Sequence, residues 1–222
     1  MATMQIDHLF IRARVGAPEA ALLRSFGLSE GSGNRHPGQG TENRRFFFHN
    51  AFLELLWIAN DDEVRSARTS PTLLAERLAD ASPACPFGIC WRPSSDDVAA
   101  PFPCWGYTPA YLPPGMQIGI GADVPASEPM WFFLPKGAAP SAYPEARRQP
   151  LNHAAGVNTI TSVTLTLPLP QQALSAATKA SSTSAQLTLL EGDAYLMEIC
   201  FDHGAQGRTH DCRPGLPLVL HY

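Results

Sequence analysis

Two carboxylates stand inside runs of apolar residues. Glu54 lies within residues 51–58, Ala-Phe-Leu-Glu-Leu-Leu-Trp-Ile, and Glu198 lies within residues 195–201, Tyr-Leu-Met-Glu-Ile-Cys-Phe. A carboxylate in an apolar strand is costly unless it is paired, hydrogen-bonded or bound to a metal ion. The alternatives are a solvated face of the sheet or an arginine partner.

His8 lies in another strand-like run, residues 5–12. A period of two places His8 on one face with Ile6 and Phe10, and leaves Asp7, Leu9 and Ile11 on the other face. An imidazole nitrogen and the Glu54 carboxylate on neighbouring strands would form half of a divalent metal site. Taken alone, His8 is equally compatible with a hydrogen-bonded histidine of the core.

Polar side chains between these strands could contact a ligand. The loop of residues 35–41 is rich in glycine and carries His36 and Gln39. In the following strand Asn43 and Arg45 alternate with Phe46, so one face of this strand is polar, and an arginine can bind a carboxylate through two hydrogen bonds. The alternatives are a simple connecting turn and solvent-facing side chains.

The elements that would position these residues recur along the chain. A strand over residues 5–12, a helix over residues 17–26 and a hairpin of residues 43–48 and 51–58 form a βαβββ order. A further helix is expected over residues 71–79. Similar orders follow, so we divide the chain into a first unit at residues 4–60, a degenerate second at 84–136 and a partial third at 157–221.

The composition of the 222 residues limits the partners. Apolar residues make up 45% and charged residues 16%, which is typical of a globular chain. A net charge of −4 without clustered arginines argues against nucleic acid and membrane partners. The lack of a signal-like start predicts a cytoplasmic protein. Five cysteines without a CxxC pair suggest reduced thiols, and a nucleophilic Cys90 or Cys104 stays open.

The chain resembles the vicinal oxygen chelate (glyoxalase/dioxygenase) superfamily, and within it the glyoxalase-like domain proteins. The segments that carry this resemblance are residues 6–9, 35–41, 43–46 and 52–56. It implies an α+β fold in which repeated βαβββ modules form curved mixed sheets around a cleft, with residues 1–222 as one compact unit. It also implies metal ligands on the first and last strands of a module, which are the positions of His8 and Glu54.

The other copies depart from this pattern. Alignment sets Ile89 opposite His8, and Phe132 or Phe133 opposite Glu54, so the second copy supplies no ligand. In the third copy Ser162 falls opposite His8. Glu198 falls opposite Glu54 and is expected to act as a third ligand or general base.

The resemblance predicts a metal-dependent enzyme of lyase, isomerase or dioxygenase type that acts on a small oxygenated molecule. His8 and Glu54 would hold iron, manganese, nickel or zinc, and His36, Gln39, Asn43 and Arg45 would bind substrate. A homodimer would fit the superfamily. The alternative is a metal-free protein that binds or sequesters a small molecule between walls formed by Trp57, Trp91, Trp105 and Trp131. In a third interpretation His8 and Glu54 remain only as a buried hydrogen-bonded pair.

Overall fold

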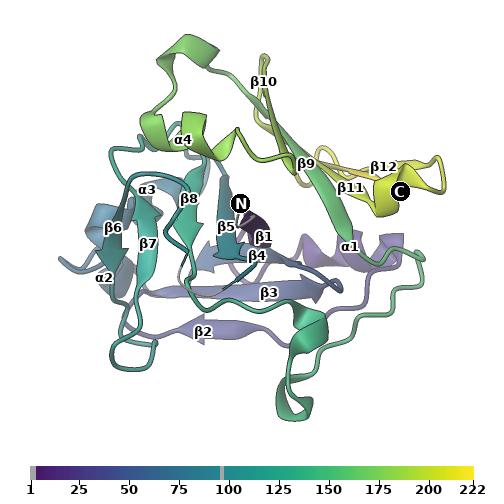
Figure 1. The fold of residues 1–222 in the computed structure, drawn as a ribbon, viewed down its shortest axis with the longest axis horizontal. Coiled ribbons are helices and arrows are strands. Elements are labelled where there is room, and N and C mark those ends of the chain that lie inside the picture. The colour runs from purple at the N-terminus through teal and green to yellow at the C-terminus, as the bar shows by residue number, and fades with distance from the viewer. Residues whose placement is uncertain (1–3, 96–97) are drawn as a thin grey trace.

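The computed structural model describes residues 4–95 and 98–222, which form two β-sheets with short helices (Figure 1). Sheet A contains β1 (Met4–Arg12), β2 (Asn34–His36), β3 (Thr41–Phe47), β4 (Phe52–Ile58), β5 (Phe87–Pro93), β6 (Cys104–Tyr107), β7 (Ile118–Gly121) and β8 (Met130–Phe133). Sheet B contains β9 (Ile160–Leu167), β10 (Leu187–Glu191), β11 (Leu196–Phe201), β12 (Thr209–Asp211) and β13 (Leu218–His221). The α-helices are α1 (Ala20–Phe26), α2 (Asp61–Val64), α3 (Leu74–Leu78) and α4 (Ala176–Ser181). The 3-10 turns are η1 (Ser70–Thr72), η2 (Pro140–Ala142), η3 (Glu145–Arg147), η4 (Gln171–Ala173) and η5 (Asp202–Gly204).

Sheet A is built from two halves with the same strand connections. Its order is β2-β3-β4-β1-β5-β8-β7-β6. In each half the first strand pairs in parallel with the last, β1 with β4 and β5 with β8, and the halves meet where β1 and β5 run antiparallel. The expected α+β fold with curved mixed sheets is thereby confirmed.

Sheet B has different connections. β9 pairs in parallel with β10, the strand that follows α4, and antiparallel with β11. In sheet A the corresponding parallel partner of the first strand is the last strand of its half. The division of the chain into three units stays a prediction, and the strand pairing of residues 160–221 is not that of residues 4–58.

The two sheets differ in how they are buried. One face of sheet A packs against sheet B, and the side chains of this main core include Leu9, Ile89, Val163 and Ile199. The opposite face of sheet A carries a second apolar cluster, closed by Leu74 and Leu78 of α3 and by other side chains. The central strands of sheet A are therefore covered on both faces, whereas β9 and β11 alternate between buried and half-buried residues.

A β-bulge interrupts β1 at the residues that matter most. The pairing with β5 shifts between Ile6 and His8, which leaves Asp7 as the extra residue. Ile6 consequently joins Leu9 in the main core, while Asp7 contacts His8. The strict alternation expected from the sequence, with Ile6 beside His8 and Asp7 on the other face, is wrong for this reason.

The helices are shorter than the sequence patterns predict. α1 ends at Gly27, which has a φ of 108° and accepts the left-handed conformation without a Cβ penalty. The helix expected over residues 71–79 is divided because Leu73 has a φ of 59°. None of the helices in the described part of the chain is long and apolar enough to cross a membrane.

Candidate active site

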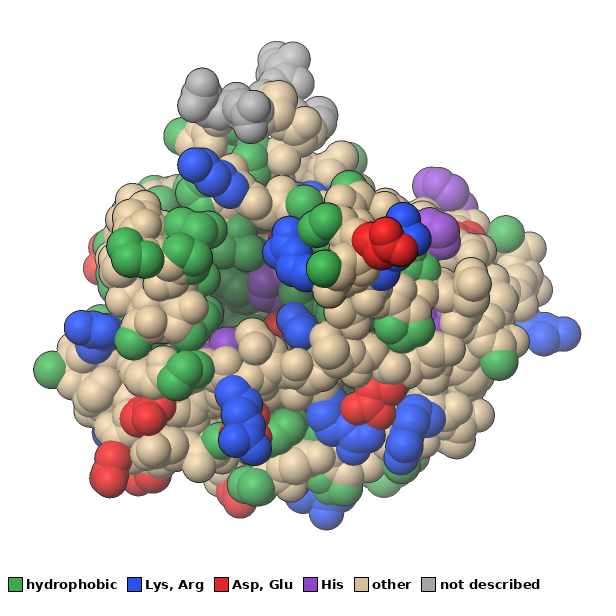
Figure 2. All heavy atoms as spheres, turned by 90° about the horizontal axis from the view of Figure 1, so that it is seen from below, with side chains coloured by type: hydrophobic (Ala, Val, Ile, Leu, Met, Phe, Trp, Pro, Cys, Tyr) green, Lys and Arg blue, Asp and Glu red, His purple; other side chains and the backbone are tan. Residues whose placement is uncertain are grey.

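A cavity of about 180 Å³ opens on the face of sheet A that points away from sheet B. Most of its lining is apolar, including Phe10, Phe52, Met130 and Phe132, and its charged and imidazole side chains come from β1, β2, β3 and β4. Figure 2 shows the hollow, with hydrophobic side chains on its walls and histidine, acidic and basic side chains within it or at its edge. A concave apolar pocket with a few polar groups is the usual form of a small-molecule site.

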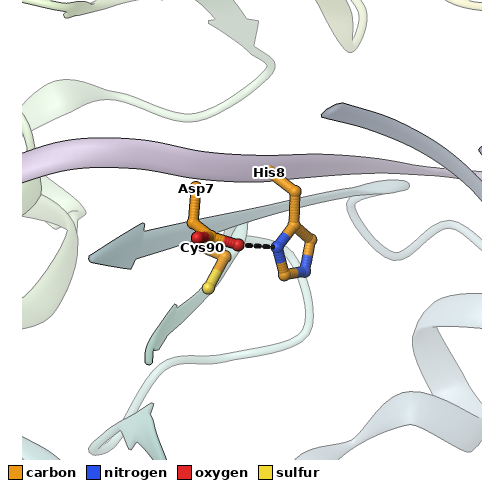
Figure 3. Close-up of side chains that lie close together, drawn as sticks. All are labelled: Asp7, His8 and Cys90. Atoms are coloured by element: carbon orange, nitrogen blue, oxygen red, sulfur yellow. Dashed lines mark hydrogen bonds and ion pairs between the residues drawn. The ribbon is translucent and has the colours of Figure 1, made fainter. Parts of the chain in front are cut away.

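His8 lies in this cavity and is fixed by two neighbours. Its ring stacks on Phe52 with centroids 4.4 Å apart, and its Nδ1 lies 2.7 Å from Oδ1 of Asp7 (Figure 3). The Asp7 carboxylate also accepts a hydrogen bond from the guanidinium of Arg92, so Asp7 is ionised and the His8 Nδ1–H donates to it. This leaves the lone pair of His8 on Nε2, the ring nitrogen away from Asp7.

Arg92 supports Asp7 from behind. Its Nη1 lies 3.3 Å from Oδ2 of Asp7, and both side chains are 4% exposed. The guanidinium also donates to the carbonyls of Ile6 and Asn50 and to Oε1 of Gln5. A buried ion pair with its remaining donors satisfied is geometrically fixed, so Asp7 holds the His8 ring in one orientation.

Glu54 lies in the cavity on β4, the parallel neighbour of β1. It is buried, and Oε1 accepts a hydrogen bond of 2.9 Å from Nδ2 of Asn43. Burial raises the pKa of the Glu54 carboxyl above its ordinary value, although the charges of His8 and Arg45 act in the opposite direction. The predicted ligand residues His8 and Glu54 thus share one cavity.

The predicted substrate-binding residues surround this pair. His36 and Gln39 line the cavity, and both contact the Thr41 hydroxyl, at 2.9 Å and 2.8 Å. Burial, followed by the charges of Arg45 and His8, lowers the pKa of His36 to about 4, so His36 is neutral at pH 7. Tyr111 packs against His36 with centroids 4.8 Å apart and donates to Oε1 of Gln39 at 3.4 Å.

Arg45 and Asn43 occupy different places relative to the cavity. Arg45 lines it directly, opposite Glu54 in the pairing of β3 with β4, and its guanidinium lies 5.7 Å from the Phe52 ring. Asn43 lies behind Glu54 and is not part of the cavity lining. Its amide nitrogen donates to Glu54, and its Oδ1 accepts from the backbone N–H of Asn34. Asn43 therefore orients Glu54.

Glu198 is not brought to this site. It lies on β11 in sheet B, between the buried side chains of Met197 and Ile199, and its own side chain is 29% exposed. Its Oε1 contacts Nε2 of His221 at 3.0 Å. The prediction that Glu198 acts as a third ligand or general base for this pair is corrected, because β11 packs on the other face of sheet A.

The cavity walls and the second half of sheet A also differ from expectation. Trp57, Trp91 and Trp131 belong to the main core, so the walls are formed by phenylalanine, tyrosine and aliphatic side chains instead. Ile89 points into that core as well, and Cys90 is the residue of β5 that pairs with His8. Phe132 faces the cavity, as the alignment with Glu54 requires, and supplies no ligand.

One other group of side chains could hold a metal ion by proximity alone. Single ligand atoms of Asp7, His8 and Cys90 lie within 4.8 Å of one another (Figure 3). The Asp7 carboxylate is already shared between His8 and the Arg92 guanidinium, and burial raises the pKa of the Cys90 thiol well above its usual value. A cation here would oppose the guanidinium, so this group supports His8 rather than binding metal.

His8 and Glu54 fit the divalent ion that the superfamily resemblance implies. They offer an imidazole nitrogen and a carboxylate, the donors that iron, manganese, nickel and zinc accept. Each is oriented by a second buried side chain, Asp7 and Asn43 respectively, which is the usual support of a metal ligand. Among the described histidine, cysteine and acidic residues, Glu54 joins no group of three candidate ligands, so a complete coordination shell would need other donors such as water or the ligand.

Sequence reasoning missed the residues that support this pair. The sequence pattern places Asp7 on the opposite face, because no sequence signal marks the bulge. Arg92 lies far from Asp7 in the sequence and reaches it only through the pairing of β1 with β5. Tyr111 lies in a proline-rich segment whose path over the cavity depends on tertiary packing. A polar Asp-His pair at the start of an apolar strand was the only available signal.

Comparison with known proteins agrees with this architecture. A family model described as a glyoxalase-like domain matches residues 6–181. Among solved structures, a hypothetical protein from Staphylococcus aureus is similar, with 11% sequence identity, 98% of each chain covered and a TM-score of 0.54. At this identity the likeness concerns the fold. No match is found among curated proteins.

Proposed function

Because the chain belongs to the glyoxalase-like domain family, we propose that it is an enzyme that transforms a small oxygenated molecule in the sheet A cavity. The observation that carries this proposal is the convergence of His8 and Glu54 on one apolar cavity, each held by its own buried partner. Apolar side chains with separately oriented acid and base groups favour proton transfer at a bound ligand.

The side chains have distinct roles in this proposal. Asp7 keeps the Nδ1 proton of His8 in place, so that Nε2 presents a lone pair to the cavity. Burial lets Glu54 hold a proton at a higher pH than an exposed glutamate, and the Asn43 amide fixes the carboxyl. His36 is neutral and Gln39 is an amide, so both bind ligand oxygen or hydroxyl groups without adding charge.

A divalent ion would be held by Nε2 of His8 and by Glu54 in its ionised form. When bound it would act as a Lewis acid that polarises a ligand carbonyl or stabilises an oxyanion, in place of the proton transfer open to the metal-free pair. The apolar walls then serve a second purpose, since exclusion of water strengthens electrostatic interactions within the cavity. The type of reaction depends on the ligand, because proteins with the same fold catalyse different reactions.

A second candidate function is metal-free binding or sequestration of a small molecule in the same cavity. It is favoured by the incomplete ligand set, since Glu54 belongs to no group of three candidate histidine, cysteine or acidic ligands among the described residues. A binding protein would retain its ligand affinity after treatment with a chelator.

Elemental analysis of tag-free protein tests the proposal. After incubation with iron, manganese, nickel or zinc and removal of free ions, we expect about one ion per chain. His8→Ala and Glu54→Ala each reduce this to background while circular dichroism shows that the fold is retained. Glu198→Ala is the matched control, since it removes a carboxylate from a similar apolar run outside the cavity and keeps the ion.

Wild-type protein that stays empty with every ion would contradict metal-dependent catalysis. Retained ion in both His8→Ala and Glu54→Ala would place the metal elsewhere. If the wild-type protein binds none of the ions but still binds a ligand in the presence of a chelator, the metal-free candidate function would be favoured.

A further inference from the structure

The most informative unused feature of the cavity is the charge on Arg45. All its hydrogen bonds go to neutral groups of one turn, namely the carbonyl and hydroxyl of Ser32 and the carbonyl of Gly33. These bonds use Nε and Nη2, and Nη1 donates to no group of the described residues. Arg45 also forms no ion pair within the described ranges 4–95 and 98–222.

The adjacent residue shows what a paired arginine looks like in this strand. Arg44, on the other face of β3, donates from Nε and Nη2 to the two carboxylate oxygens of Glu30, each at 2.5 Å. Arg45 faces the cavity. Glu54 is its partner in the pairing of β3 with β4, but the guanidinium and the carboxylate are too far apart to form an ion pair. A half-buried guanidinium with an uncommitted donor is suited to bind an anion.

Among the described residues Glu54 is the one acidic side chain that lines the cavity, and a divalent ion held there, as proposed above, would offset its charge. Asp7 is neutralised by Arg92, and His36 is neutral at pH 7. Phe52 connects the two ends of the floor, because its ring stacks on His8 at 4.4 Å and lies under the Arg45 guanidinium at 5.7 Å. A molecule whose anionic group contacts Arg45 therefore occupies the cavity that Phe52 and His8 also line.

The walls and the volume limit the remainder of that molecule. The cavity holds about 180 Å³ and is lined by Phe10, Ile120, Met130 and Phe132. A dry apolar cavity of about 150 Å³ is enough for benzene. The space next to Arg45 therefore matches one six-membered ring or a branched chain of similar size.

We infer that the ligand is a small monocarboxylic acid with an apolar body about the size of one ring, whose carboxylate is bound by Arg45. This inference rests on the proposed function, because it names the substrate class of the same cavity. Binding through the carboxylate would leave the carbon next to it close to His8 and Glu54, the groups proposed to act on the ligand.

Calorimetric titration with benzoate and with benzamide tests the inference. The two probes have nearly the same shape, and only benzoate carries a charge. We expect benzoate to bind at least about tenfold more tightly than benzamide, as a charge-assisted hydrogen bond requires. Arg45→Met should weaken benzoate by a similar factor and leave benzamide unchanged.

Two further variants keep the test decisive. Arg147→Met is the matched control, since Arg147 also stacks on an aromatic ring, Tyr143, and is exposed outside the cavity, and it should bind benzoate like the wild type. If Arg45→Met does not fold, Arg45→Lys keeps the charge but loses the planar donor pair, and should bind benzoate severalfold more weakly. Its benzamide affinity should stay unchanged.

The outcomes separate this inference from the proposed function. Equal binding of benzoate and benzamide, unchanged in the arginine variants, would overturn the carboxylate assignment while leaving the cavity as a ligand site. Binding of neither probe, with wild-type protein that still holds a metal ion through His8 and Glu54, would overturn the ligand class alone. Binding of neither probe together with an empty metal site would overturn both.

Discussion

Two glutamates with nearly the same sequence surroundings have different positions in this molecule. Glu54 is buried in a cavity, with an amide partner, on a strand covered on both faces. Glu198 is half-buried on a strand whose residues alternate, and it contacts His221 near the surface. In this molecule, the carboxylate within an apolar run is buried where both faces of its strand are covered, and partly exposed where the strand alternates.

Asp7 of sheet A and Asp211 of sheet B each pair with an arginine, and these two ion pairs offer the largest contrast in stability. Arg92→Met leaves the buried Asp7 carboxylate without its guanidinium, and we expect the free energy of unfolding to fall by about 3–5 kcal/mol. Arg213→Met removes the partner of Asp211, where both side chains are about half exposed, so the loss should be much smaller than for Arg92→Met. Urea unfolding of both variants measures this, and equal losses would remove the distinction between the two regions.

Substitutions next to Glu198 test the alternation of β11. Ile199→Ala removes a fully buried side chain from the main core and should lower the free energy of unfolding by about 2–4 kcal/mol. Glu198→Ala should change it by less than about 1 kcal/mol, since its contact with His221 is partly exposed. A larger loss for Glu198→Ala than for Ile199→Ala would mean that the outward assignment of Glu198 is wrong.

Loss of the Asp7 carboxylate tests whether His8 is positioned from behind. In Asp7→Asn the amide can no longer fix the ring as a carboxylate does, so metal affinity should fall about 10–100-fold. The matched change on sheet B is Glu198→Gln, which alters the other carboxylate in contact with a histidine and should leave metal affinity unchanged. Competition with a chelating dye measures both, and an unaltered affinity in Asp7→Asn would exclude the proposed support.

The smallest expected effect is the change with pH in the stability of wild type relative to Glu54→Gln. The folded pKa of Glu54 is raised above its unfolded value, mainly by burial. Its protonated form therefore stabilises the fold below the unfolded pKa, and this contribution is lost as pH rises through the folded pKa. In metal-free protein, wild type should lose stability relative to Glu54→Gln as pH rises from about 4.5, the ordinary glutamate value. A constant difference across that range would show that the Glu54 pKa is not raised.

The sequence was sufficient for the fold class and for the expectation that His8 and Glu54 lie on neighbouring strands. The hairpin of β3 and β4 and the position of Glu54 follow from apolar runs and turn residues, and the resemblance implied a ligand position for His8 on the first strand, which pairs with β4. The bulge at Asp7 was not predictable, because a one-residue change of register depends on how β1 and β5 pair. Glu198 was misplaced for a related reason, since alternation on β11 is hidden when outward positions are also apolar, as Leu196 and Cys200 are.

The composition of the cavity walls was also predicted wrongly from the sequence. Tryptophans were expected to form them, but bulky rings on β5 and β8 point into the core between the sheets. Sequence patterns give the alternation of a strand, and they do not say which of two apolar faces contains the cavity. That choice is made by α3 and by the segment that carries Tyr111, both of which line the cavity from outside sheet A.

Carboxyl-carbon NMR of Glu54 tests the central claim most directly. In metal-free protein the Glu54 resonance should titrate above the ordinary glutamate range, and addition of a bound divalent ion should remove that titration by holding the carboxylate ionised. His8→Ala should abolish the response to the ion while the raised pKa persists. A Glu54 resonance that titrates in the ordinary range and ignores every divalent ion would contradict the assignment of this cavity as a metal-dependent active site.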